Sequence, residues 1–366
     1  MKRKAMAVLM AATMAVLGLA GCGASGAGNN GQGETVQTAE TQESSTEVQN
    51  EEVQSVQEQT TETEAYTAAD IRVGSLKGPT SMGLMKLMKN AEEGTAANNY
   101  TFTMETAADA LLPKMIQGEL DIILVPANVA SVLYNKTEGG VSVIDINTLG
   151  VLYMVSADDS FTTIADLKGK TIYLTGKGTT PDYVLHYLLE QNGLNEGDVT
   201  LEYKSEATEV AAVLANEPES IGLLPQPFVT AACAKNENLK VIFDTTKEWD
   251  AVQGESGSRL VTGVTVVRNE FLQENPAAVK KFLEEHKASA EFANTNVEET
   301  AELVAAQGII EKAPVAQKAI PNCNITYIDG EEMKTALSGY LEVLMEQNPE
   351  SVGGSLPTDD FYYNGQ

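Results

Sequence analysis

Two short loops of glycine and hydroxyl residues recur at matching points in the two halves of the chain. Gly78-Pro79-Thr80-Ser81 stands between a strand pattern and a helix pattern, and Gly178-Thr179-Thr180-Pro181 has the same setting later in the chain. Free N–H groups and the helix dipole suit such a point to an anionic or strongly polar ligand group. A plain helix cap is the alternative for each loop alone, but the recurrence favours a binding role for both.

Two further turns, Pro126-Ala127-Asn128 and Pro225-Gln226-Pro227, follow buried-type strands and offer one side-chain amide each. In doubly wound sheets, ligands bind at the carboxyl ends of the strands. Two lobes that face each other would therefore present these amides and the hydroxyl loops to one cleft. Ordinary turn chemistry is the alternative interpretation of both amides.

Side chains suited to catalysis are scarce, since the chain has only two His residues. His186 lies between apolar positions of a predicted helix, and His286 lies in the charged stretch 284–287, which predicts a solvated face. The sequence carries no His/Cys metal spacing, no nucleophile elbow and no dinucleotide fingerprint. We therefore expect no catalytic residue, no metal site, no cofactor and no enzymatic activity.

Cys233 lies in a helix-like stretch and Cys323 in a loop far along the chain, so we expect two separate thiols, although an exported protein could pair them. The single Trp, Trp249, lies in a polar stretch. We expect it to cover the edge of a core, and a place beside the cleft is the alternative.

Strand and helix patterns alternate from residue 71 onward, which indicates an α/β fold of two doubly wound, largely parallel sheets. The first half has strands at 71–76, 100–105 and 121–125 and helices at 82–89, 107–117 and 129–134. After 141–146 and 149–156 the order restarts with strands at 171–175, 199–203 and 220–224 and helices at 181–191 and 208–215. Strands at 239–244 and 260–268 precede a helical C-terminal region at 278–293, 297–307 and 330–347.

The first residues have the form of a bacterial export signal. Three basic residues precede an apolar run that is too short for a stable membrane span, and the run ends in Leu19-Ala20-Gly21-Cys22. This ending resembles the lipobox of bacterial lipoproteins, which implies cleavage after residue 21 and acylation of Cys22. An ordinary signal peptide with an incidental Cys is the alternative. Acyl chains would tether the protein to the outer face of the plasma membrane.

Residues 22–70 form a lipidated Cys followed by a polar spacer. From residue 23 the segment has ten acidic residues and no Lys or Arg, so it cannot bury enough apolar surface to fold and we expect disorder. The whole chain has 24 basic and 52 acidic residues, which argues against nucleic acid as a partner. The remaining length exceeds one ordinary core, so two lobes are expected.

Together these features resemble the solute-binding lipoproteins of ABC importers. More narrowly, the chain is similar to the branch that includes nitrate, sulfonate, taurine and thiamine-precursor binders. The residues that carry this resemblance are 76–87, Asp166-Leu167-Lys168-Gly169-Lys170, Gly178-Thr179-Thr180-Pro181-Asp182-Tyr183, and Asn269-Glu270-Phe271 with Asn275-Pro276. It covers essentially all of 71–366.

The resemblance implies a type II periplasmic-binding-protein fold that traps a ligand as two lobes close about a two-strand hinge. The two strands that cross between the lobes and form the hinge would lie at 147–149 and 261–263. Lobe one would then consist of 71–147 plus 264–366, and lobe two of 148–263. The implied ligand contacts are the two hydroxyl loops together with Asn128, Thr148 and Gln226. The implied ligand is an anion such as a sulfonate or nitrate, or a heteroaromatic vitamin precursor. These loops lack Arg and His, which argues against a strongly anionic ligand and leaves room for a neutral heteroaromatic one.

The expected function is capture of a small molecule for an ABC permease and its ATPase, by a monomer. A secreted enzyme on the same scaffold would need a convergent acid, base or nucleophile in the cleft. A ligand sensor or surface adhesion module is the third possibility, and the sequence alone does not separate a sensor from a transport subunit.

Overall fold

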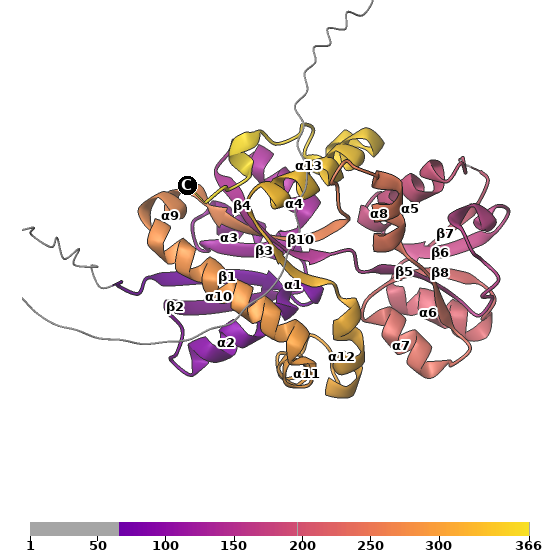
Figure 1. Ribbon diagram of the computed structural model, residues 1–366, viewed down its shortest axis with the longest axis horizontal. Coiled ribbons are helices and arrows are strands. Elements are labelled where there is room, and N and C mark those ends of the chain that lie inside the picture. The colour runs from indigo at the N-terminus through magenta and orange to yellow at the C-terminus, as the bar shows by residue number, and fades with distance from the viewer. Residues whose placement is uncertain (1–65, 196, 366) are drawn as a thin grey trace, which may run out of the picture. The chain divides into compact units, whose positions relative to one another are not determined.

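The computed structural model describes residues 66–195 and 197–365, which belong to one compact unit (Figure 1). The predicted signal peptide 1–21, the lipidation site Cys22 and the spacer as far as residue 65 lie outside the described residues. Two β-sheets organise the described chain. We call the six-stranded sheet with its helices lobe one, and the five-stranded sheet with its helices lobe two.

The lobe-one sheet has the strand order β11-β4-β10-β3-β1-β2. Strand β1 pairs in parallel with β2 and β3, whereas β10 runs antiparallel to both β3 and β4. The sheet is therefore mixed at the centre, where the sequence predicted largely parallel strands. Its strands are β1 Asp70–Leu76, β2 Asn99–Glu105, β3 Ile122–Pro126, β4 Val141–Leu149, β10 Val261–Arg268 and β11 Ile325–Ile328.

The lobe-two sheet repeats this plan with the order β7-β6-β8-β5-β9. Strand β6 pairs in parallel with β7 and β8, and the antiparallel strand β5 lies between β8 and β9. The second half thus repeats the design of the first, as predicted. Its strands are β5 Leu152–Ser156, β6 Thr171–Thr175, β7 Thr200–Lys204, β8 Ile221–Pro225 and β9 Lys240–Asp244.

Helices pack against both faces of each sheet (Figure 1). In lobe one they are α1 Pro79–Met82, α2 Met85–Glu92, η1 Ala108–Ala110, α3 Leu112–Ile116, α4 Ala127–Lys136, α9 Asn269–Glu274, α10 Pro276–Thr295, α11 Val297–Ala306, α12 Ala313–Ala319, η3 Ile320–Asn322, α13 Gly330–Gln347, η4 Pro349–Val352 and η5 Asp359–Phe361. In lobe two they are η2 Ile164–Leu167, α5 Thr180–Gln191, α6 Ala207–Asn216, α7 Phe228–Lys235 and α8 Thr245–Gln253. The predicted α/β fold of two doubly wound lobes with a helical C-terminal region is confirmed.

Local backbone chemistry explains where the elements differ from the predictions. The helix predicted at 82–89 is divided at Gly83, and the one predicted at 107–117 begins anew at Leu112 because Pro113 suits only a first turn. Helix α4 begins at Ala127, so Asn128 lies in its first turn and not in a loop. The sequence analysis missed β11, α8, α9 and α12.

The two lobes are joined by short connections. Strand β4 ends at Leu149 and β5 begins at Leu152, so only Gly150 and Val151 separate the sheets at the first crossing. The chain returns when β10 begins at Val261, which pairs with Leu149. These strand ends lie within a few residues of the crossings expected at 147–149 and 261–263.

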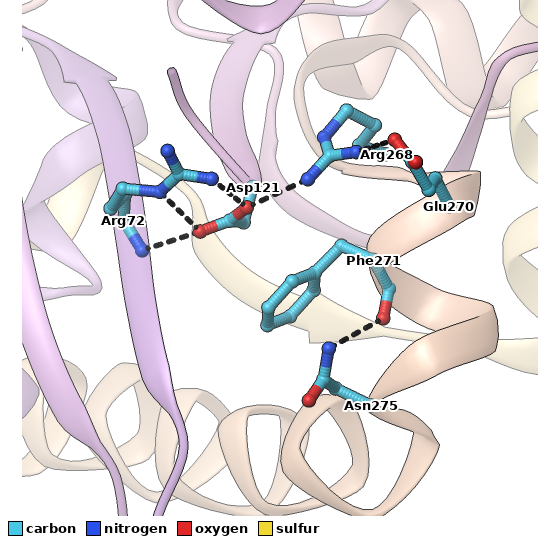
Figure 2. A network of polar contacts seen from close by, with 6 residues as sticks. All are labelled: Arg72, Asp121, Arg268, Glu270, Phe271 and Asn275. Atoms are coloured by element: carbon cyan, nitrogen blue, oxygen red, sulfur yellow. Dashed lines mark hydrogen bonds and ion pairs between the residues drawn. The ribbon is translucent and has the colours of Figure 1, made fainter. Parts of the chain in front are cut away.

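A buried carboxylate ties three strands together at the opposite end of the lobe-one sheet, where β1 and β3 begin and β10 ends (Figure 2). Asp121 accepts hydrogen bonds from the Arg72 side chain at 2.5 and 2.8 Å and from Arg268 at 3.1 Å. Its side chain is only 1% exposed. Arg268 also pairs with the exposed Glu270. This ion cluster therefore stabilises the end of the sheet that lies opposite the predicted binding loops.

Candidate functional site

The four predicted loops lie at two sheet edges that the Gly150–Val151 connection joins. In lobe one, the loops after β1 and β3 start at the edge where β4 ends and β10 begins, since Pro126 pairs with Gly263. In lobe two, the loops after β6 and β8 share the edge where β5 begins, since Leu152 pairs with Pro225. The topology therefore brings both edges to the same crossing.

Thr80 and Thr148 flank Gly263 at the lobe-one edge. A Cβ atom on Gly263 would lie 2.5 Å from Thr80 Cγ2 and 3.3 Å from Thr148 Cβ. Only glycine leaves room for this approach, so the close packing of the two threonines explains the glycine. Both threonines are buried in this conformation. The structure thus brings these two predicted residues together.

The first hydroxyl loop leads into a helix that is too short to carry a substantial dipole. Helix α1 spans four residues, and Pro79 in its first turn has no N–H to offer. Ser81 is fully buried and donates its hydroxyl to the carbonyl of Leu76. Gly78 and Pro79 are half-buried. The anion-binding role expected from a helix dipole therefore has no support at this loop.

Asn128 turns toward the C-terminal segment of the chain. Its Nδ2 donates to the carbonyl of Ser351 at 3.3 Å. The neighbouring Ser131 hydroxyl donates to the carbonyl of Val352 at 2.7 Å, which fixes the same segment against α4. The Asn128 amide thus has a structural partner, and its Oδ1 atom is the acceptor it has left for a ligand.

The second hydroxyl loop is held from both sides. The N–H of Gly178 donates to Asp182 Oδ2 at 2.7 Å, and its carbonyl accepts the hydroxyl of Tyr183 at 2.7 Å. Thr179, which is exposed, donates its hydroxyl to the carbonyl of Gly176 at 2.5 Å. Gly176 and Gly178 both have positive φ, of 77° and 71°, so the loop needs glycine at both positions.

Asp182 is the centre of a polar cluster behind this loop. It is 7% exposed and accepts the Tyr203 hydroxyl at 2.6 Å, and His186 Nε2 lies 3.3 Å from its Oδ1. Burial and the hydrogen bond to Asp182 raise the pKa of Tyr203 above its ordinary value. His186 thus contacts the carboxylate of Asp182, one helical turn earlier on α5, and the sequence analysis did not predict this contact.

The second loop also contacts the C-terminal helix. Complete burial raises the pKa of Tyr340 on α13 above its ordinary value, and a side-chain hydrogen bond with Thr180 opposes this rise only in part. Asn348, just beyond α13, donates its Nδ2 to the Tyr183 hydroxyl at 2.9 Å. Helix α13 also packs against α4 and β4, so it contacts both lobes.

Gln226 lines a cavity of about 340 Å³ whose walls come from both lobes. Its Oε1 accepts the Thr230 hydroxyl at 2.8 Å, which leaves the amide Nε2 as a donor. Lobe one contributes Lys318 and Asn322, and the Asn322 carbonyl accepts the hydroxyl of Tyr153 at 2.8 Å. Gln226 is thus the predicted site residue for which the structure shows an interlobe cavity.

A buried hydrogen-bond chain runs across the lobe-one sheet to Thr148, and the sequence analysis missed it. Thr148 donates to Asn147 Oδ1 at 2.9 Å, Asn147 Nδ2 donates to Thr265 at 3.1 Å, and Thr265 donates to Asp145 Oδ1 at 2.9 Å. His286 Nδ1 lies 3.1 Å from Asp145 Oδ2. Because a carboxylate only accepts, Nδ1 carries the proton.

The prediction of a solvated His286 is wrong, because its side chain is completely buried. The charged neighbours in 284–287 obscured its position on the apolar stripe of α10. That stripe follows helical spacing through Val279, Phe282, His286, Ala290 and Ala293, all of which are buried. This periodicity is the signal that could have placed His286 in the core.

The other singled-out residues have structural places. Trp249 is fully buried between the rings of Tyr187 and Tyr340, so it covers a core as expected. Cys233 and Cys323 are free thiols, as predicted. Over the described residues, no cluster of His, Cys, Asp and Glu side chains suits a metal ion, and no helix has the length and apolarity to cross a bilayer.

Comparison with known sequences gives a family match. Residues 136–300 match the family model described as NMT1/THI5 like. A protein of Brucella abortus (strain 2308), described only as a binding protein, is 25% identical over 187 residues, which are 51% of this chain. The match spans 56% of that relative, so the chain covers little more than half of the length of the curated relatives it matches.

Comparison with solved structures gives the fold. An ABC transporter protein of Parabacteroides distasonis has a TM-score of 0.68 at 24% identity, over 81% of this chain and 99% of that one. The periplasmic aliphatic sulphonate-binding protein of Escherichia coli has a TM-score of 0.65 at 16% identity, over 81% and 93% of the two chains. The predicted resemblance is confirmed: residues 136–300 match the NMT1/THI5-like family, and the described chain has the fold of the two-lobed periplasmic binding proteins.

Proposed function

We propose that the protein is the extracytoplasmic solute-binding subunit of an ABC importer. One observation carries this proposal: each lobe has two of the four polar loops at one edge of its sheet. These two sheet edges meet at the Gly150–Val151 connection. A small molecule bound between such edges bridges the lobes and favours their closed arrangement. The matched family and the E. coli sulphonate-binding protein support this function.

The proposed ligand contacts are those expected from the sequence. On lobe one they are Gly78, Pro79, Thr80, Ser81, Asn128 and Thr148, and on lobe two Gly178, Thr179, Thr180 and Gln226. Hydrogen bonds and packing are all that these groups offer, so the protein binds its ligand and does not transform it. The partners are a permease and an ATPase, and the hinge lies at the crossings near 148 and 263.

The proposal includes a lipid anchor. The sequence Leu19-Ala20-Gly21-Cys22 supports cleavage of the first 21 residues and acylation of Cys22. The acidic spacer that follows would keep the folded lobes at a distance from the lipid headgroups. The protein then acts as a monomer at the outer face of a bacterial plasma membrane.

A thermal-shift screen tests the proposed function. Sulfonates, nitrate, pyrimidines and flavin-like compounds are each added to the purified protein, because a ligand that binds only the folded state raises the melting temperature. We expect a shift with one of these classes that Gln226→Ala or Thr80→Ala reduces. A shift that neither variant changes would remove these loops from the site.

A further inference from the structure

The turn 322–324 of lobe one lies between η3 and β11 and contacts lobe two or the connection at each of its ends. Its middle residue, Cys323, is fully buried in the lobe-one core, and the Cys323 Sγ atom donates to the carbonyl of Ala319 at 3.3 Å. The next residue, Ile325, pairs with Thr148 in the lobe-one sheet. The turn is therefore fixed to lobe one, and its contacts with lobe two depend on how the lobes are oriented.

The side chain of Asn324 is bonded at the point where the chain crosses between the lobes. Asn324 Nδ2 donates to the carbonyl of Gly150 at 2.5 Å and to Thr246 Oγ1 at 3.3 Å. The Thr246 hydroxyl donates to the same carbonyl at 3.1 Å. Because this carbonyl only accepts and the hydroxyl proton is already used, the Asn324 atom that faces both must be the amide nitrogen. Lobe one, the connection and α8 of lobe two are thus joined by three hydrogen bonds.

The backbone of Asn324 adopts the left-handed conformation, with φ of 45°. Among the described residues, Asn324 shares a positive φ with glycines and one other residue, Glu138. This region is unfavourable for most side chains and is tolerated best by Gly and Asn. The Asn324 carbonyl accepts the N–H of Leu149, the last residue of β4, at 3.0 Å. Asn324 therefore bonds to the crossing chain twice, through its backbone to Leu149 and through its amide to Gly150.

Helix α8 contacts the connection from the lobe-two side. The hydroxyl of Thr245 donates to the carbonyl of Leu152 at 2.8 Å. A Cβ atom on Gly150 would lie 2.3 Å from Thr246 Oγ1, so the close approach of α8 requires glycine there. The connection and the first turn of α8 therefore form one packed unit, which the Asn324 amide contacts from lobe one.

The other end of the turn contacts lobe two at the interlobe cavity. Tyr153 on β5 donates its hydroxyl to the carbonyl of Asn322 at 2.8 Å, and both residues line the cavity together with Gln226. Tyr153 lies three residues beyond Gly150 along the chain. A rotation of lobe two about the connection therefore moves the Tyr153 hydroxyl more than it moves the Gly150 carbonyl.

We infer that Asn324 is a positioning residue that restricts rotation about the connection, and that the Tyr153–Asn322 bond forms only when the lobes are oriented as they are in this structure. The turn 322–324 is then a third link between the lobes, beside the connection itself and the return of the chain at β10. This inference rests on the proposed function, because ligand capture between the lobes depends on their orientation. Loss of the Asn324 amide should free the rotation, and loss of the Tyr153 hydroxyl should favour more widely separated lobes.

Distances between two spin labels on the ligand-free, full mature chain test this inference. The labels are attached at Glu92→Cys on α2 and Ala212→Cys on α6, both exposed positions in different lobes, and Cys233→Ser removes the half-buried native thiol. Pulsed electron paramagnetic resonance then gives the distribution of lobe separations. A role in the stability of one lobe alone would change the melting temperature but not this distribution.

Two variants of Asn324 test the amide. Asn324→Gly removes the amide and keeps the left-handed backbone accessible, and Asn324→Asp keeps the size but places a carboxylate oxygen against the Gly150 carbonyl. We expect both variants to widen the distribution of label distances. Glu138→Gly is the matched control, because it makes the same change at an exposed left-handed residue after α4 and should leave the distribution unchanged.

Tyr153→Phe tests the contact at the cavity. The loss of one hydrogen bond should shift the ratio of the two lobe arrangements by about two- to tenfold toward longer label distances. Tyr134→Phe is the matched control, since the hydroxyl of this buried tyrosine bonds to Asp360 at 2.7 Å within lobe one. We expect the control to have the label distances of the native protein.

An unchanged distribution in both Asn324 variants, or an equal widening in Glu138→Gly, would overturn the positioning role of Asn324. Unchanged label distances in Tyr153→Phe would overturn the role of the Tyr153–Asn322 bond, and this variant decides the inference if neither Asn324 variant folds. Because no ligand is added, these outcomes are distinct from failure of the thermal-shift screen, which would contradict the proposed function.

Discussion

His286 donates its Nδ1 proton to the Asp145 carboxylate across 3.1 Å, and neither side chain is exposed to solvent. The two residues come from α10 and β4, so the bond fastens the C-terminal helical region to the lobe-one sheet. Thr265 supplies the second hydrogen bond to the same carboxylate. The pair therefore anchors the hydrogen-bond chain that ends at Thr148.

Replacing His286 with Ala should destabilise the fold strongly. It leaves a buried carboxylate with one hydrogen-bond donor fewer, and the loss of one partner from a buried pair costs about 3–5 kcal/mol. Urea denaturation at neutral pH measures the change. The control is Glu284→Gln on the exposed side of α10, which should cost less than about 1 kcal/mol. Equal stability of the two variants would show that the buried pair contributes little.

Much of this fold follows from sequence pattern, and the exceptions have physical reasons. Strand β6 coincides with the predicted 171–175, because its apolar alternation is bounded by Gly169 and Gly176. Strand β11 was missed because a four-residue strand carries too little periodicity. The antiparallel pairing of β10 with β3 and β4 could not be foreseen, since the partner and direction of a returning strand depend on tertiary contacts.

The sequence indicated which loops could form the candidate site, but not which of their polar groups are already hydrogen-bonded within the protein. The recurrence of the hydroxyl loops pointed to both sheet edges. The sequence could not show that Asn128 bonds to Ser351 or that Asp182 bonds to Gly178, because these bonds depend on side-chain geometry. It also suggested an anion site at Gly78, where the four-residue α1 provides none.

Thr80→Ala and Thr180→Ala should each weaken ligand binding by about 0.5–1.5 kcal/mol for each hydrogen bond that is lost. Calorimetric titration with the ligand found by the thermal-shift screen gives the affinities. Thr208→Ala is a suitable control, because Thr208 is exposed on α6 outside the proposed contacts. Full affinity in both test variants would exclude these threonines as contacts.

Protonation of Asp121 should lower the free energy of unfolding at acid pH. Burial raises the pKa of Asp121, but hydrogen bonds from Arg72 and Arg268 outweigh it and hold the pKa below its ordinary value of 3.8. A lowered pKa in the folded state contributes stability above the ordinary value, and this contribution is lost as the pH falls through the folded value.

Asp121→Asn should therefore cost on the order of 3 kcal/mol at neutral pH. The difference from the native protein should narrow only below about pH 4. Urea denaturation across this range checks both statements. Glu270→Gln, which changes only the exposed partner of Arg268, should behave like the native protein. A difference between Asp121→Asn and the native protein that does not vary with pH would contradict the assignment.

Cys22→Ala should release the protein from the membrane. The change removes the thiol that carries the proposed acyl chains, so fractionation should find the variant in the medium or the soluble fraction. The replacement of the exposed Lys235 by Ala, far along the chain, serves as the control and should leave the protein with the membrane. Equal membrane retention of the Cys22 variant would contradict the lipid anchor.

Ligand binding should bring the two lobes closer together, because the proposed ligand contacts both lobes only when they are closed. Spectroscopic labels at Glu92→Cys on α2 and Ala212→Cys on α6, both exposed positions, report the separation of the lobes after Cys233→Ser removes the half-buried native thiol. If the proposed hinge closes on the ligand, the mean distance between the labels should become shorter and its distribution narrower when ligand is added. The radius of gyration from X-ray scattering should decrease as well. Tight ligand binding with an unchanged label distance and an unchanged radius of gyration would contradict the proposed hinge and capture of the ligand between the lobes.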